Sequence, residues 1–153
     1  MLEKSFNQVY EKFKLNFYKN IFKNFEDREA SLTSSETISV EVIYALNRPT
    51  VSEYANFLNI SHPNAAYKIS SLVRKGYIQK IRSKNDRREF HLEVTDKFHA
   101  YNDLKNSYIV TVMERIHEHF SKEDVEKLEK ILQAISSELM PEISSAVAGR
   151  ELR

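Results

Sequence analysis

The chain has 153 residues, of which 41% are hydrophobic and 29% charged, and its formal net charge is +1 at pH 7. This length and composition are those of an ordinary globular protein with a core of its own. The absence of cysteine excludes disulfides and thiolate chemistry. No apolar run approaches the roughly 20 residues of a membrane span and no signal-peptide core opens the sequence, so we expect a cytoplasmic protein without a membrane partner.

Residues 2–25 predict a long amphipathic helix, in keeping with a sequence that contains only two glycines and three prolines. Its apolar stripe consists of Leu2, Phe6, Val9, Tyr10, Phe13, Phe17, Ile21 and Phe25. A helix of this length measures about 35 Å, more than a small domain covers alone. The stripe therefore requires a partner.

A second helix is predicted after the charged residues 26–29. Thr33 and Glu36 have the spacing of a capping box, in which each side chain binds the other residue's backbone amide. We expect this helix to end near Asn47. Its predicted buried side chains are Ile38, Val42, Ile43 and Leu46.

The stretch from Thr50 to Thr95 has the pattern of a winged helix-turn-helix. Thr50 and Glu53 form a second capping-box pattern, which starts a short helix after Pro49. Ser61 is the expected N-cap of the next helix, in which Pro63 is tolerated because the amides of the first turn have no intrahelical partner. Gly76 ends this helix. The buried faces of the two helices are predicted from Val51, Ala55 and Leu58, and from Ala65, Ile69 and Leu72.

The side of the second helix opposite its buried face is polar near the start and cationic near the end. Such a helix suits the major groove of DNA, because its first residues reach base edges while later cations meet phosphates. From this helix we predict that DNA is bound by Ser61, His62, Pro63, Asn64, Tyr67, Lys68, Ser71 and Arg74. His62 is expected to face the DNA backbone.

A β-hairpin with a basic tip is predicted after Gly76. Residues 77–82 and 90–94 have strand character, and residues 83–86 form the turn. Lys84, Arg87 and Arg88 then face solvent and suit a narrow, strongly negative minor groove. Asp86 is expected to orient the Arg88 guanidinium through a bidentate pair.

Charge is concentrated in this region. Between His62 and Lys97 there are nine Lys and Arg residues against four Asp and Glu residues, so the rest of the chain is acidic. A solvated charged face is the plain alternative. The combination with a helix-turn-helix and a wing favours DNA binding.

Two more helices are predicted in the C-terminal third, one from Thr95 to about Phe120 and one that begins after the N-cap Ser121 and ends near Pro141. Both are amphipathic. Together with the N-terminal helix they predict a homodimer interface, since a monomer would expose too much apolar surface. The alternative is that they fold back onto the winged domain. The expected parts of the chain are residues 1–30 and 96–153 for dimerisation and residues 31–95 for DNA binding.

The central residues carry a resemblance to the MarR family of bacterial transcriptional regulators. The matching segments are residues 51–55, 60–65 and 72–78, and the motif Asp86-Arg87-Arg88 followed by residues 92–95. The resemblance implies a homodimer in which the helix at residues 61–75 reads the major groove and Arg88 enters the minor groove. Tyr67 stands where many relatives have Arg or Ser, which predicts a different operator preference. Phe98 replaces a family glycine.

A small-molecule effector is also predicted, because a cleft between the dimer helices and the winged domain holds ligands in relatives. Its expected lining consists of Phe13, Phe17, Tyr44 and Tyr101, for which plain core packing is the alternative. No cofactor and no metal site are expected. His99 and Asp103 are nevertheless spaced to share a metal, and the family includes metal sensors, so a metal-responsive regulator stays an alternative.

The carboxylates are scattered, and neither a phosphate loop nor a nucleophile elbow is present, so the sequence does not predict an enzyme. It predicts a mainly α protein with a small β-hairpin wing that acts as a dimeric repressor on a pseudo-palindromic operator. A winged-helix protein-interaction module without sequence-specific DNA binding is the alternative from another class.

Overall fold

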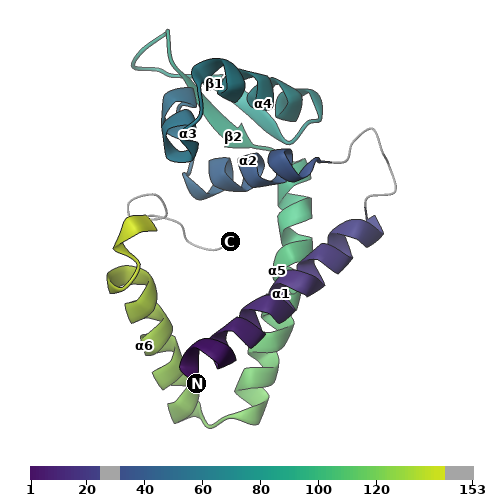
Figure 1. Ribbon diagram of the computed structural model, residues 1–153, viewed down its shortest axis with the longest axis vertical. Helices are drawn as coiled ribbons and strands as arrows, with labels where there is room; N and C mark the ends of the chain where they lie inside the picture. The colour runs from purple at the N-terminus through teal and green to yellow at the C-terminus, as the bar shows by residue number, and fades with distance from the viewer. Residues whose placement is uncertain (25–31, 144–153) are drawn as a thin grey trace. The chain divides into compact units, whose positions relative to one another are not determined.

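The computed structural model describes residues 1–24 and 32–143, which form a mainly helical protein with one β-hairpin (Figure 1). This confirms the predicted fold class. The helices are α1 (Leu2–Asn24), α2 (Ser34–Ala45), α3 (Val51–Leu58), α4 (His62–Arg74), α5 (Asp96–His119) and α6 (Lys122–Glu138), and the strands are β1 (Ile78–Arg82) and β2 (Phe90–Val94). The chain divides into one unit of Met1–Arg28 and Ala100–Leu139 and another of Glu29–His99 and Met140–Arg153.

The helix starts follow from local capping. At α2, the Thr33 hydroxyl accepts from the Glu36 amide at 3.2 Å and the Glu36 carboxylate accepts from the Thr33 amide at 2.8 Å, which confirms the capping box. At α3, Thr50 accepts from the Glu53 amide at 3.1 Å. The second hydrogen bond of the predicted capping box, from the Thr50 backbone amide to the Glu53 carboxylate, is wrong. The carboxylate accepts instead from the Thr50 hydroxyl, at 3.2 Å.

The core of the second unit is built by α2, the helix-turn-helix of α3 and α4, the hairpin and the first turn of α5. Its fully buried apolar side chains include Val40, Ile43, Tyr54, Ala55, Ala65, Ile69, Leu72, Ile78, Leu92 and Phe98. The Tyr54 hydroxyl donates to Ser39 at 2.8 Å inside this core, where burial raises the pKa of the tyrosine. The prediction for Ile38 is wrong. Its side chain is 56% exposed, because it lies about 200° around α2 from the buried Val40.

The hairpin is fixed to the turn between α2 and α3. Its strands pair antiparallel, with Ile78 opposite Val94 and Arg82 opposite Phe90. On its other edge, β2 is held by a 2.8 Å hydrogen bond from the Leu92 amide to the carbonyl of Pro49, the residue that ends the turn. Strand β2 is therefore hydrogen-bonded along both of its edges.

The first unit is held by contacts between α1 and α5. Phe13 meets Tyr108 edge to face at 5.7 Å between ring centroids, and Phe17 meets Tyr101 in the same way at 5.8 Å. Helix α6 buries none of its side chains. In the part of the chain that the structure describes, no helix combines the length and apolarity needed to cross a membrane.

Gly76 follows the C-cap of α4 with a backbone angle φ of +82°, as the sequence predicted, and a Cβ there would meet only Lys97 Cδ at 3.7 Å. Substitution therefore strains the backbone without a clash. We expect Gly76→Ala to lower the free energy of unfolding by about 1–2 kcal/mol. Gly76→Asn should cost less, because Asn tolerates the left-handed region better. Urea denaturation of the three proteins tests this order, and equal stability of the Ala and Asn variants would contradict it.

Candidate nucleic-acid interface

The burial of one side of α4 fixes which side faces solvent. Ala65, Ile69 and Leu72 are fully buried. The Ser61 hydroxyl accepts from the Asn64 amide at 3.3 Å and so caps the helix start. Tyr67 is 76% exposed. Other exposed side chains of the helix and its cap include Ser61, His62, Pro63, Asn64 and Arg74.

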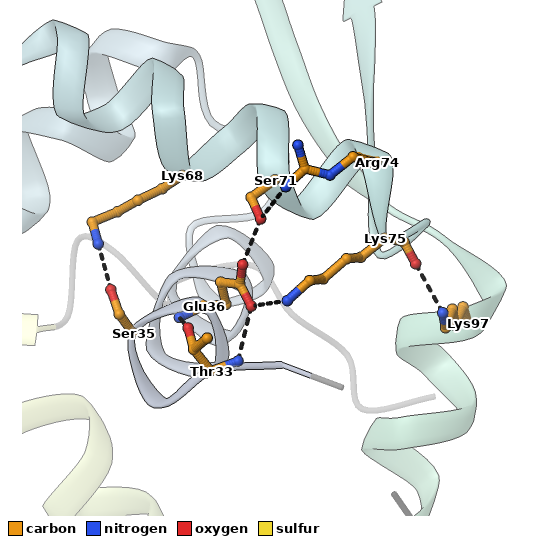
Figure 2. A network of polar contacts seen from close by, with 8 residues as sticks. All are labelled: Thr33, Ser35, Glu36, Lys68, Ser71, Arg74, Lys75 and Lys97. Carbon is orange, nitrogen blue, oxygen red and sulfur yellow. Dashed lines mark hydrogen bonds and ion pairs between the residues drawn. The ribbon is translucent and has the colours of Figure 1, made fainter. Parts of the chain in front are cut away.

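Two predicted members of this face are bound to α2. Ser71 is only 7% exposed, and its hydroxyl donates to Glu36 Oε1 at 2.5 Å. The prediction that Ser71 borders the DNA-facing surface is therefore wrong, because α2 covers that position. Lys68 is half-buried, and its Nζ donates to the Ser35 hydroxyl at the start of α2 (Figure 2).

Glu36 is the buried carboxylate at the centre of these contacts (Figure 2). Besides Ser71, it accepts from Lys75 Nζ at 2.6 Å and from the Thr33 amide at 2.8 Å. Burial opposes its ionisation, but the hydrogen bonds from Lys75, Ser71 and Thr33 outweigh burial and lower the pKa of Glu36 to about 2. The lowered pKa favours the ionised form of the Glu36 carboxylate, which lies between α2 and α4.

The wing tip is a compact turn from which Lys84, Arg87 and Arg88 are exposed. Asp86 shapes the backbone of this turn, since its Oδ1 accepts from the Arg88 amide at 2.9 Å. The predicted pairing of Asp86 with the Arg88 guanidinium is wrong, as no such ion pair occurs among the described residues. The short side chain reaches the amide two residues ahead, a contact typical of Asp in turns. The Arg88 side chain is thus left for another partner.

Two further cations, which the sequence-based prediction of the interface lacks, lie on β1. Lys80 and Arg82 are exposed on β1 and lie on the same strand face as the buried Ile78, so this face changes from apolar at the base to cationic near the tip. The Arg82 guanidinium lies 5.3 Å from the centroid of the Phe90 ring. The two-residue period of the strand is the signal that identifies both cations.

The four predicted ligand-pocket residues fall in different units. Phe13, Phe17 and Tyr101 belong to the aromatic contacts of α1 with α5, whereas Tyr44 packs on Phe98 in the other unit at 4.8 Å between ring centroids. The pocket stays a prediction. A groove of about 670 Å³ lies elsewhere, between α5 and α6. Its apolar lining is made by Met113, Ile116, Val125, Leu128 and Leu132.

Within residues 1–24 and 32–143, no three His, Asp or Glu side chains are grouped so that they could hold a metal ion. The His99 ring packs edge to face against Tyr44 and Phe98, at 6.0 Å from each. The contacts of the His99 ring that the structure describes are thus with aromatic rings.

Comparison with known proteins agrees with this geometry. Residues 32–90 match the model of the MarR family. A transcriptional regulator from Thermotoga maritima is 17% identical, with a TM-score of 0.64 over 94% of this chain and 96% of that one. Streptococcus pneumoniae FabT in complex with DNA is 22% identical, with a TM-score of 0.59 over 92% and 99%. S. aureus MepR bound to ethidium bromide is 17% identical, with a TM-score of 0.60 over 92% and 97%. Among curated proteins, nothing matches the chain.

Because ionised Glu36 has a pKa below the 4.5 of a free carboxyl group, it stabilises the fold above about pH 4.5, and this contribution is lost as the pH falls towards 2. We expect the wild-type protein to lose about 1–2 kcal/mol more unfolding free energy than Glu36→Gln between roughly pH 6 and pH 3.5. Chemical denaturation at each pH measures this difference.

The matched control for this measurement is Glu53→Gln, which removes an exposed carboxylate from the same position of the next helix. It should retain the steeper pH dependence of the wild-type protein. A Glu36→Gln protein with that same dependence would contradict the account.

Proposed function

We propose that the chain is a homodimeric transcriptional regulator that binds a pseudo-palindromic sequence in double-stranded DNA, and the match of residues 32–90 to the model of the MarR family supports this proposal. In this proposal each α4 enters a major groove and each Arg88 enters a flanking minor groove. The site residues are those of the exposed face of α4 and of the wing tip, with Lys80 and Arg82 added and Ser71 removed.

The observation that supports the proposal most directly is the order of side chains along the exposed side of α4. A helix whose exposed side begins with short polar side chains and ends with Arg74 can bring Asn64 and Tyr67 to base edges while its last turn meets phosphate. The wing adds three exposed cations on a narrow turn. S. pneumoniae FabT, which shares the fold, is known in complex with DNA.

The dimer is supported by apolar surface on α1 and α6. Leu2 is 81% exposed, Phe6 61% and Leu132 48%. A helix such as α6 that buries none of its side chains gains little from folding alone, and a second copy would cover both it and the α1 stripe. To enter successive major grooves of B-DNA, the two α4 helices of such a dimer would have to lie about 34 Å apart.

Repression and release by a ligand complete the proposal. A lipophilic or aromatic molecule that binds better to a dimer with different spacing of the α4 helices would release DNA by population shift. S. aureus MepR, another protein of this fold, is known bound to ethidium bromide, a flat aromatic cation. The aromatic side chains Phe13, Phe17, Tyr44 and Tyr101 are the proposed ligand contacts.

The wing is tested with Arg88→Ala. Removal of one phosphate or groove contact per protomer should weaken binding to the DNA upstream of the chain's own gene and reduce the magnitude of the log–log salt slope by about 2 for a dimer. Fluorescence anisotropy across a salt series, with a scrambled duplex for comparison, measures both quantities.

Lys122→Ala is the control for the wing variant, because it removes an exposed cation from α6. It should bind as the wild-type protein does. Unchanged affinity of Arg88→Ala would exclude the wing from the interface, and wild-type binding without sequence preference would favour a protein-interaction module.

The dimer is tested with Leu132→Glu, which puts two carboxylates into the proposed two-fold interface. We expect the dimer dissociation constant to rise by roughly 100-fold or more, since each copy loses the burial of a leucine. Sedimentation velocity measures it. Lys130→Glu lies about 200° around α6 from Leu128 and should leave the dimer intact. A monomeric wild-type protein would contradict the proposal.

A further inference from the structure

Glu36 joins the start of α2 to the end of the recognition helix. One carboxylate oxygen accepts from the Ser71 hydroxyl at 2.5 Å, and the other accepts from Lys75 Nζ at 2.6 Å. Ser71 lies in the last turn of α4, and Lys75 is its C-cap. Figure 2 shows these side chains converging on the carboxylate from the end of α4.

Capping of α2 does not require these contacts. Glu53 occupies the corresponding position of α3, where it is exposed, and among the described residues its carboxylate accepts only from the hydroxyl of its own cap, Thr50. Glu36 caps α2 with a single bond from the Thr33 amide and uses its remaining capacity on α4. A buried ion pair adds little stability over a well-packed apolar pair. We therefore look for the role of the ion pair between Glu36 and Lys75 in the orientation of the end of α4.

The contacts of Glu36 continue to a cation on the exposed face. Because the Ser71 hydroxyl donates its proton to Glu36, its oxygen is left to accept from Arg74 Nη2, which lies 3.4 Å away. A second contact involves the backbone of Lys75, the C-cap of α4. Its carbonyl oxygen accepts a hydrogen bond at 2.8 Å from Nζ of Lys97, which lies in the first turn of α5. The last turn of α4 is thereby held from two sides.

We propose that Glu36 is a positioning residue for DNA binding, which acts through Ser71 and Lys75 to hold the last turn of α4 and its Arg74 towards a DNA phosphate. This inference rests on the proposed function. Because Glu36 itself is buried, it would act without a contact of its own to DNA. Its loss should affect the phosphate contact of Arg74 more than the base contacts at the start of α4.

The test is a double-mutant cycle on the full chain with Glu36→Gln, Arg74→Ala and the double variant. A duplex that the wild-type protein has selected from a random library is the probe, read by fluorescence anisotropy across a salt series. Glu36→Gln should weaken binding by about 2- to 30-fold. It should also reduce the magnitude of the salt slope by up to about 2, which is one phosphate per protomer. In the Arg74→Ala background it should have little further effect.

Glu53→Gln is the matched control and should bind as the wild-type protein does. Thermal unfolding followed by circular dichroism confirms that each variant is folded at the temperature of the assay. If Glu36→Gln does not fold, Ser71→Ala replaces it, because that change breaks the link to Arg74 and leaves the ion pair of Glu36 with Lys75. The same coupling and the same loss of slope are expected.

Two results overturn the inference alone, with the proposed function intact. One is a Glu36→Gln protein that binds the selected duplex as tightly as the wild type, and the other is purely additive effects of Glu36→Gln and Arg74→Ala. A wild-type protein that selects no duplex would overturn the proposed function and this inference with it.

Discussion

The burial of one face of α4 is the constraint on which the proposed DNA-binding surface depends. Ala65, Ile69 and Leu72 are fully buried against the rest of the winged unit. Because an α-helix turns by about 100° per residue, their burial leaves no choice about the rotation of the helix, and Asn64 and Tyr67 must face outward. The wing follows from the same packing, since Leu92 of β2 is buried in the same core.

The other unit poses the opposite problem, because its helices have more apolar surface than they bury. Helix α1 covers part of its stripe through Phe13 and Phe17 on α5, yet Leu2 and Phe6 remain exposed, and α6 buries no side chain. Such a surface is costly in water unless another copy covers it. The proposed dimer therefore has its physical origin in this uncovered apolar surface.

Sequence reasoning succeeded where structure is decided locally. The caps at Thr33, Ser61 and Ser121 and the left-handed turn at Gly76 depend on neighbours within four residues, and all four are as predicted. It failed where a tertiary neighbour decides. Nothing near Ser71 in the sequence indicates that its hydroxyl would donate a hydrogen bond to Glu36, 35 residues away.

Two other misses have related causes. The apolar side chain of Ile38 predicts a core position, whereas the burial of Ser39, Val40 and Ile43 sets the rotation of α2 and leaves Ile38 exposed. Asp86 was paired with a side chain by charge, but the geometry of a tight turn favours the nearer backbone amide of Arg88. Charge and hydropathy indicate which side chains could be buried or paired. The rotation of a helix about its axis and the backbone geometry of a turn then decide which of them are.

The central claim is that two copies of this chain read one DNA site together. The most direct measurement is a selection of binding sites from a random duplex library by the full chain, followed by sequencing. The account predicts an inverted repeat whose half-site centres lie about 10 base pairs apart, with A·T-rich flanks where the wings would lie. Enrichment of a single half-site, or of no sequence at all, would contradict it.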